Sequence, residues 1–223
     1  MSMGMSYGIT AETGNNIQTK GLSFYVDAAY KKSYPGSGTT WSDLVGTNNG
    51  TLTNSPTFDS SGYFTFDGTN DYVALSNSIN LTNHTVSIWC NVTATTTHKY
   101  IIDFRDGSQD GVIIWSSTSE TINYRINDAT TLTTDGNYSS SWININGTYD
   151  GATQKLYING TLLKNQDISK TVNVTQAAAI GTFAASPNYY FKGSIANMYV
   201  YSRALTAGQI LQNYNAVKDR FGL

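Results

Sequence analysis

The clearest signal along the chain is an alternation of apolar and polar side chains with a period of two residues. Between Thr85 and Val92, one parity is apolar and consists of Val86, Ile88, Cys90 and Val92. Such alternation is typical of a strand with one face in a core and the other outside it. Comparable short segments recur between turn residues, and we expect strands at Leu22–Ala28, Tyr63–Asp67, Tyr72–Leu75, Thr85–Val92, Tyr100–Arg105, Gly111–Trp115, Thr121–Asn127, Trp142–Thr148, Gln154–Ile158 and Ser194–Tyr201. This spacing predicts an all-β domain.

One turn in this series is specified by its residues. Asn159-Gly160 separates two apolar segments, and this pair accepts the positive φ values that a two-residue type I′ hairpin requires. We therefore expect a tight hairpin at this point.

A single helix is predicted, at the C-terminus. Thr206 and Gln209 have the spacing of a capping box, in which each side chain bonds the other's backbone N–H. An apolar stripe follows, consisting of Ile210, Leu211, Tyr214 and Val217. We expect this short helix to cover an open end or an edge of the β-sheets.

The chain divides into an arm and one domain. Residues 1–20 show little periodicity and carry only two charges, on Glu12 and Lys20, whereas the strand pattern begins at Gly21. We interpret residues 1–20 as an N-terminal arm and residues 21–223 as one domain. The arm could become ordered on a partner by adding a strand to a sheet edge, or it could pack as an extra strand on its own domain.

Charge and composition exclude several classes of partner. The net charge is −2, from 13 basic and 15 acidic residues, so a basic surface for nucleic acid is not expected. No apolar run is long enough to insert into a membrane, and the start of the chain lacks the pattern of a secretory signal peptide. Cys90 is the single cysteine, so no intrachain disulfide forms.

Catalytic groups are scarce. Retaining glycosidases use two carboxyl groups about 5 Å apart, often on Glu side chains. This chain has only Glu12 and Glu120, which lie 108 positions apart, and neither His84 nor His98 sits in a nucleophile or metal motif. We expect no enzymatic activity and no catalytic residues.

A candidate binding face lies on the meander from Tyr100 to Asn127. Ile102, Phe104, Ile122, Tyr124 and Ile126 share the parity of the core. The opposite parity gathers the candidate glycan-binding residues, which are Trp115, Asp103, Arg105, Asn123 and Arg125. An aromatic plane beside polar groups suits a sugar, whose ring has apolar C–H faces and polar hydroxyls. The alternative is a solvated sheet face with a cross-strand Arg/Asp pair.

A calcium site is a second candidate. The segment from Asp103 to Asp110 supplies carboxylates at Asp103, Asp106 and Asp110, and Ca²⁺ prefers oxygen ligands. The segment lacks the EF-hand spacing, and Asp and Gly are also ordinary turn residues. No other cofactor is indicated.

Two tyrosines mark a possible contact surface. Tyr189 and Tyr190 follow Pro187-Asn188 at an expected hairpin tip. Exposed tyrosines there would suit a protein contact, while packing beneath the turn is the alternative.

Several segments together resemble one family. They are residues 21–29 (GLSFYVDAA), 33–44 (SYPGSGTTWSDL), 64–73 (FTFDGTNDYV), 155–160 (KLYING) and 199–205 (YVYSRAL). In this order they resemble the laminin G-like branch of the concanavalin A-like lectin/glucanase superfamily, in the form found in bacteriophage virion proteins. The resemblance implies a jelly-roll sandwich of two antiparallel sheets.

The resemblance also implies a function. We expect a non-enzymatic virion structural protein, such as a capsid-surface decoration or a tail or fibre component, that is made in the host cytoplasm and displayed on the virion. Its partners would be other virion proteins, reached through the arm, and carbohydrate on the host surface; a homo-oligomer is left open. The alternative is a free-standing carbohydrate-binding module or a bacterial adhesin domain.

Overall fold

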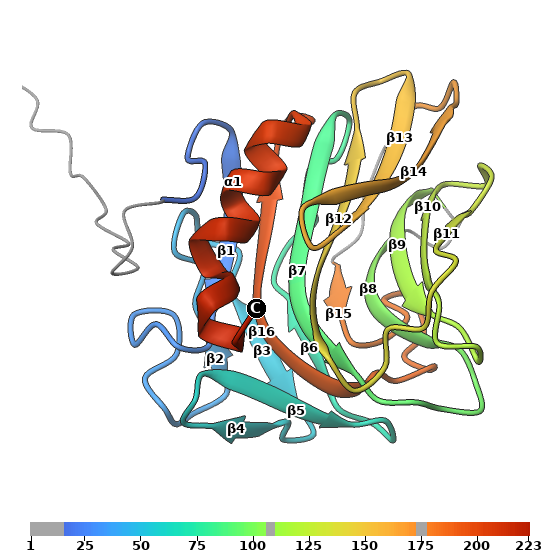
Figure 1. Cartoon of the computed structure of the whole chain (residues 1–223). Coiled ribbons are helices and arrows are strands. Elements are labelled where there is room, and N and C mark those ends of the chain that lie inside the picture. Colours follow the sequence, from blue (N-terminus) through green and yellow to red (C-terminus); the bar gives the residue numbers. More distant parts are fainter. Residues whose placement is uncertain (1–15, 106–109, 173–177) are drawn as a thin grey trace, which may run out of the picture.

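Two antiparallel sheets pack face to face in the computed structural model, which describes residues 16–105, 110–172 and 178–223 (Figure 1). The first sheet has the order β14-β13-β12-β7-β16-β5-β4, with β1 also paired to β16. Its strands are β1 (Leu22–Asp27), β4 (Thr57–Asp59), β5 (Tyr63–Asp67), β7 (His84–Val92), β12 (Trp142–Tyr149), β13 (Thr153–Ile158), β14 (Thr161–Asp167) and β16 (Lys192–Tyr201).

The second sheet has the order β11-β10-β9-β8-β15-β6-β3-β2. Its strands are β2 (Thr40–Trp41), β3 (Gly50–Thr53), β6 (Tyr72–Leu75), β8 (Lys99–Arg105), β9 (Gly111–Ser116), β10 (Ile122–Ile126), β11 (Leu132–Thr133) and β15 (Ala179–Ile180). The expected all-β jelly-roll sandwich with a short C-terminal helix is therefore confirmed, and all ten predicted strands are present within one or two residues at each end.

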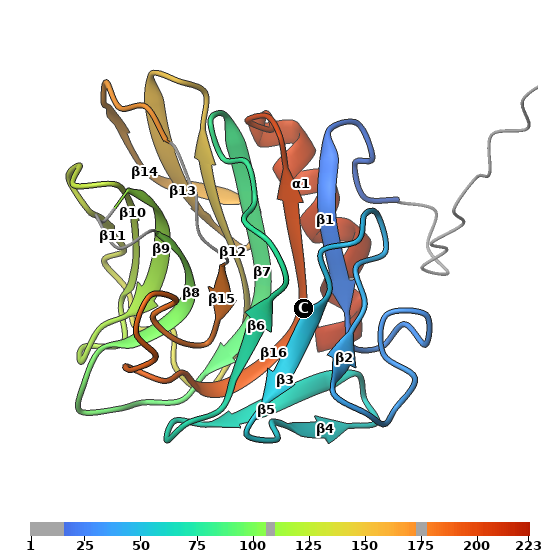
Figure 2. The ribbon, with the colours of Figure 1, turned by 180° about the vertical axis from the view of Figure 1, so that it is seen from behind.

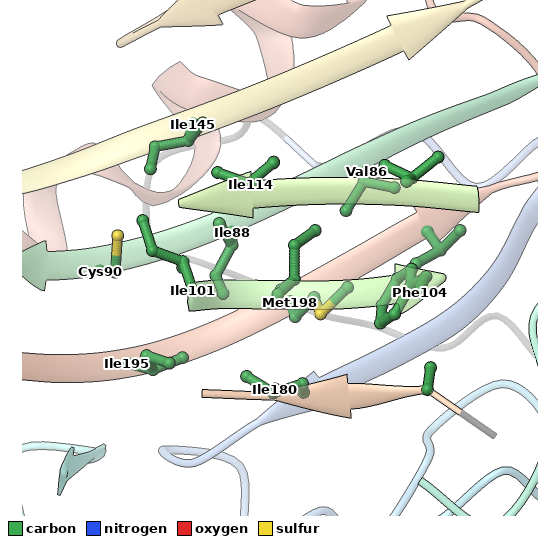
Figure 3. Packing of buried hydrophobic residues seen from close by; sticks show 14 of the residues in the cluster. Val86, Ile88, Cys90, Ile101, Phe104, Ile114, Ile145, Ile180, Ile195 and Met198 are labelled. Carbon is green, nitrogen blue, oxygen red and sulfur yellow. The ribbon is translucent and has the colours of Figure 1, made fainter. Parts of the chain in front are cut away.

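The main core fills the space between the sheets. Val86, Ile88 and Cys90 of β7 are fully buried, as their alternation predicted, and they lie opposite Phe104 and Ile114 of the second sheet (Figure 3). Close packing of these branched and aromatic side chains removes apolar surface from water, which is the main force that holds the two sheets together.

The helix lies on a different surface from the one expected. α1 (Ala207–Val217) and the 3-10 helix η1 (Lys218–Phe221) cover the outer face of the first sheet, in front of β1 and β16 in Figure 1 and behind them in Figure 2. Stacking of aromatic rings holds the helix on this face. The outward side chain of Trp89 stacks on Tyr214 at 5.6 Å and on Phe221 at 4.5 Å between ring centroids. The helix thus covers a second apolar layer, a cluster of buried side chains that includes Trp89, Tyr199 and Ile210.

The capping box is confirmed, whereas the predicted stripe is partly wrong. Gln209 N–H donates to Thr206 Oγ1, and Thr206 N–H donates to Gln209 Oε1. Ile210 is buried, but Leu211 is 46% exposed, because the sheet-facing positions are Ile210, Asn213 and Ala216. With eleven residues, α1 is too short to cross a membrane, and no helix in the described ranges is both long and apolar enough to do so.

Residues 16–20 belong to the domain and not to a separate arm. Ile17 is buried against the second apolar layer, and Gln18 N–H donates to Asn213 Oδ1 at 2.8 Å. Tyr201 also donates its hydroxyl proton to the carbonyl of Gln18. The predicted boundary at residue 20 therefore falls too late; the remainder of the proposed arm, residues 1–15, lies outside the described residues.

Asp27 and Asp43, which lie in the segments 21–29 and 33–44, stabilise the fold through hydrogen bonds and an ion pair. Asp43 Oδ1 accepts the N–H groups of Tyr25 and Val45, and Asp27 forms an ion pair of 2.8 Å with Arg220 of η1. Asp27 also accepts the Tyr25 hydroxyl, and burial together with this carboxylate raises the pKa of Tyr25. These motif residues thus serve the fold, since they join β1 to its neighbours and to the C-terminus.

A buried histidine connects the two sheets. His84 of β7 donates from Nδ1 to the carbonyl of Leu81 at 2.7 Å, and its Nε2 accepts the hydroxyl of Tyr124 from β10 at 2.8 Å. The carbonyl can only accept, so Nδ1 carries a proton, and in the neutral ring Nε2 is then the acceptor. Complete burial lowers the pKa of His84 to about 4, because the imidazolium would be poorly solvated.

The orientation of α1 on the sheet can be tested with two neighbouring residues. We expect Ile210→Ala to lower the free energy of unfolding by about 2–5 kcal/mol, because it leaves a cavity under the helix. Leu211→Ala should change it by no more than about 0.5 kcal/mol, since that side chain is half exposed. Urea denaturation measures both, and equal losses would contradict the orientation of the helix.

The histidine gives the fold a pH dependence. Its pKa is lower in the folded chain than the usual 6.5, so the unfolded chain binds more protons between pH 6.5 and 4. Stability contributed by neutral His84 is present above this window and is lost as the pH falls through it, by about 2 kcal/mol between pH 7 and 5. Denaturation at both pH values should show this loss in the native chain and in the exposed control His98→Gln, but not in His84→Gln.

Candidate functional site

Two rows of side chains cross the outer face of the second sheet, the face turned away from the main core. In the first row Tyr100 of β8, Trp115 of β9 and Asn123 of β10 are direct cross-strand partners. In the second row Asp103, Ile113 and Arg125 are partners in the same order of strands. Antiparallel pairing brings such neighbours to about 5 Å between Cβ atoms, so the sheet itself places these side chains together.

A β-bulge gives the site its second aromatic residue. The register between β8 and β9 shifts between Tyr100 and Ile102, and the extra residue, Ile101, is buried in the main core. Simple alternation would put Tyr100 on the core face with Ile102 and Phe104. The bulge instead turns it outward beside Trp115, which is a common use of bulges near binding sites.

The loop between β15 and β16 forms one wall of the site. It passes beside β8 (Figures 1 and 2), and Tyr100 N–H donates to the carbonyl of Tyr189 at 2.9 Å. The carbonyl of Asn188 accepts both Phe183 N–H and the Thr182 hydroxyl, which closes the loop on itself. The ring of Tyr189 lies 5.2 Å from that of Tyr100, so the loop brings a third aromatic side chain to the face.

These side chains enclose a cavity of about 240 Å³ on the protein surface, lined by His98, Tyr100, Ile113, Trp115, Arg125 and Tyr189. The volume lies just below the range of about 300–1,000 Å³ that is usual for small-molecule sites. It therefore suits one small ring with the rest of a ligand outside.

A buried ion pair lies beside this cavity. Arg105 donates from Nε and Nη2 to the carboxylate of Asp103, with the shortest contact at 2.6 Å, and both side chains are almost fully buried. Burial raises the pKa of Asp103, while its bonds from Arg105 oppose that rise. The Arg105 guanidinium lies 5.4 Å from the ring centroid of Tyr100 and 5.1 Å from that of Phe183. The ion pair thus holds the Arg105 guanidinium against the aromatic wall of the site, formed by Tyr100 and Phe183. The carboxylate of Asp103 is occupied by Arg105.

Arg125 differs from Arg105 in what surrounds it. Its guanidinium lies 5.7 Å from the ring centroid of Trp115, and within the described part of the chain it has no hydrogen bond or ion pair. Its Nε is buried without a partner, and burial together with the charge of Arg105 lowers its pKa. Arg125 therefore offers hydrogen-bond donors to the cavity.

The sequence-predicted glycan residues thus divide into two groups. Trp115 and Arg125 line the cavity, whereas Asp103 and Arg105 are occupied by each other. Asn123 adjoins Trp115, but its Oδ1 accepts the Thr133 hydroxyl at 2.8 Å, so it holds the edge strand β11 in place. Only part of the predicted cluster is open to a ligand.

The proposed calcium residues do not form a metal site in the ranges that the structure describes. Asp103 is bound by Arg105, Asp110 lies just before β9, and Asp106 lies outside the described residues. No group of three acidic, histidine or cysteine side chains suited to a metal ion occurs in the described ranges.

The two tyrosines of the predicted contact surface have different roles. Tyr189 is 48% exposed and lines the cavity, and its φ of +51° places it in the left-handed region that few residues with side chains adopt. Tyr190 donates its hydroxyl to the carbonyl of Pro187 and packs near Tyr72, so it lies against its own domain. A protein contact through this loop stays a prediction.

Sequence reasoning missed Tyr100, Phe183 and His98, whereas strand alternation places Ile113 on the same face as Trp115. Tyr100 depends on the bulge, and Phe183 on a loop about 80 residues away along the chain, so neither had a local signal.

Residues 67–211, more than half of the length of the chain, match the family described as Concanavalin A-like lectin/glucanases superfamily. The chain belongs to this superfamily. Among curated protein sequences, none matches it.

Solved structures share the lectin-like fold. The botulinum neurotoxin serotype D binding domain has a TM-score of 0.70 and 16% identity, covering 87% of this chain and 51% of that one. The ligand binding domain of the same serotype in complex with N-acetylneuraminic acid has a TM-score of 0.69 and 15% identity, covering 87% and 50%. Trypanosoma rangeli sialidase in complex with sialic acid has a TM-score of 0.73 and 13% identity, covering 95% and 35%.

The chain matches only part of each of these longer proteins. The chain spans about half the length of the neurotoxin chains and about a third of the sialidase chain. At these identities the likeness shows the fold.

The placement of Trp115 in this lectin-like domain gives a stability prediction. Because Trp115 is only half-buried, Trp115→Ala should lower the free energy of unfolding by about 1 kcal/mol. Trp89→Ala, which empties the layer under the helix, should cost about 3–5 kcal/mol. Urea denaturation followed by circular dichroism measures both; if Trp115→Ala unfolds the chain, Trp115 is part of the core.

Proposed function

We propose that this domain is a non-catalytic glycan-binding module whose sugar site is the cavity between Trp115, Tyr100 and Arg125. The observation that carries the proposal is a partly exposed tryptophan at an open cavity, beside a guanidinium that has no hydrogen-bond partner among the described residues. Lectin sites combine these elements, because an aromatic plane covers the apolar face of a sugar while polar groups orient its hydroxyls.

The similar structures support carbohydrate as the ligand. Two of them were determined with bound sialic acid, which is a sugar, although the chain is only 15% and 13% identical to them. Carbohydrate on a cell surface is the partner that we propose on this basis. The family assignment agrees with it, since the superfamily is described by its lectins and glucanases.

Glycoside cleavage is less well supported by the geometry. A hydrolase of the retaining type needs two carboxyl groups on either side of the bond that it cleaves. In the part of the chain that the structure describes, the side chains that line the cavity carry no carboxyl group, and Asp103 beside it is held by Arg105. We therefore propose binding without catalysis.

The place of the domain in an assembly is a separate proposal. The sequence resemblance to phage virion proteins supports a role on the virion surface, with other virion proteins and host glycans as partners. The similar structures described above belong to neurotoxins and a sialidase, and they do not bear on this placement. Cosedimentation with purified virions tests it, and a module or adhesin outside a virion is the alternative.

Glycan binding itself is tested on an array followed by titration of the best sugar. We expect Trp115→Ala to weaken binding at least tenfold, because it removes the plane on which the ring stacks. Tyr30→Ala is the matched control. It removes a half-buried aromatic side chain from another hollow of about 220 Å³, lined mainly by apolar residues, and should leave the affinity unchanged.

The reverse result, with binding lost in Tyr30→Ala and kept in Trp115→Ala, would move the site to that second hollow. Absence of binding to every glycan on the array would contradict the proposed function.

A further inference from the structure

The charge of the cavity points to the kind of sugar that it takes. Among the described residues, the six that line it include one permanent cation, Arg125, and no carboxylate. The nearest buried acid, Asp103, is already compensated by Arg105 at 2.6 Å. The three side chains together therefore leave one positive charge, and it sits on the residue that lines the cavity.

The donors of Arg125 are also unused. A guanidinium has five N–H donors in a planar fork, and within the described residues none of those of Arg125 is bonded. Contact with the face of Trp115 compensates part of the charge, but it leaves these donors unpaired. A partly buried guanidinium in this state gains more from an anionic ligand than one that is already paired, as Arg105 is.

The arrangement of the cavity favours a planar anion on a ring. Trp115 on β9 and Arg125 on β10 lie in adjacent rows of the same face. A sugar ring stacked on Trp115 would carry a substituent toward Arg125, and a carboxylate matches the guanidinium fork with two parallel hydrogen bonds. The cavity volume of about 240 Å³ accommodates one such ring.

We propose that the cavity selects glycans with an acidic terminal sugar, whose carboxylate binds Arg125 while its ring stacks on Trp115. This inference rests on the proposed function and names the ligand class of the same site. We commit to a carboxylate on the sugar ring; a sulfate or phosphate ester can also meet the fork with two oxygens, and the sulfated sugar in the test below distinguishes the two.

The test compares each acidic sugar with its own methyl ester, which removes the negative charge and adds one methyl group while the ring stays the same. The probes are oligosaccharides that end in glucuronate or N-acetylneuraminate, their methyl esters, and a sulfated galactoside, titrated into the full chain by NMR. We expect each acid to bind at least tenfold more tightly than its ester and than the sulfated sugar. Equal binding of acid and ester would overturn the proposal, as would a preference for the sulfated sugar.

Variants then assign the preference to one residue. Arg125→Gln should weaken binding of the acids by about tenfold to a hundredfold, the effect of losing hydrogen bonds to a charged group, while binding of the esters changes little. Arg125→Lys keeps the charge without the fork and should fall between the native chain and Arg125→Gln. Lys164→Gln removes one positive charge from β14 of the first sheet, where Lys164 bonds Asp135 and does not line the cavity, and should leave the preference intact.

The outcomes separate this inference from the proposed function. If Arg125→Gln weakens acids and esters equally, Arg125 only shapes the cavity and the inference fails. If esters and neutral sugars bind as well as acids and depend on Trp115, the glycan site stands and the acidic preference is wrong. If no sugar binds at all, the proposed function fails first. Circular dichroism of each variant confirms that its fold is intact before affinities are compared.

Discussion

Alternation of side chains along paired strands is the constraint on which the rest of the molecule depends. Each residue that points into the core fixes its neighbours on the outer face, because a shift of one position would exchange the two sets. The inner faces meet and fill one main core. Sandwiches of this fold can therefore differ from one another on their two outer faces. In this molecule the two outer faces also differ strongly from each other.

On the first sheet the outer face is aromatic and is covered. Trp89, Tyr199 and their neighbours would expose a large apolar patch without α1, and stacking of Trp89 on Tyr214 and Phe221 binds the C-terminal segment to the sheet. On the second sheet the outer face is left open, with a buried ion pair supporting an aromatic wall. One face thus contributes stability and the other contributes the candidate site.

The sequence predicted the parts of this arrangement that are local. Regular alternation located β7, and the Thr206–Gln209 capping box located the start of α1, since both signals lie within a few residues. The same reasoning placed Trp115 and Arg125 on one face, because they lie on neighbouring strands of a meander.

The features that sequence reasoning missed depend on contacts between distant segments. The bulge at Ile101 reverses the parity of Tyr100, and nothing in the local pattern marks it. Leu211 has the character of a buried residue, yet the sheet meets the helix along Ile210 and Asn213. Likewise, the amide of Asn123 could bind a sugar, but Thr133 across the strand pair already uses it.

The origin of the site's walls has a consequence for how such a domain can diversify. Trp115 and Arg125 belong to the hydrogen-bonded ladder, so their spacing is as constant as that of the strands. Tyr189 belongs to a connection that leaves the second sheet at β15 and enters the first at β16. Insertions in this connection would reshape the mouth of the cavity without disturbing a single strand pair. Recognition of new ligands could therefore evolve by exchange of one surface loop, while the platform beneath it is inherited unchanged.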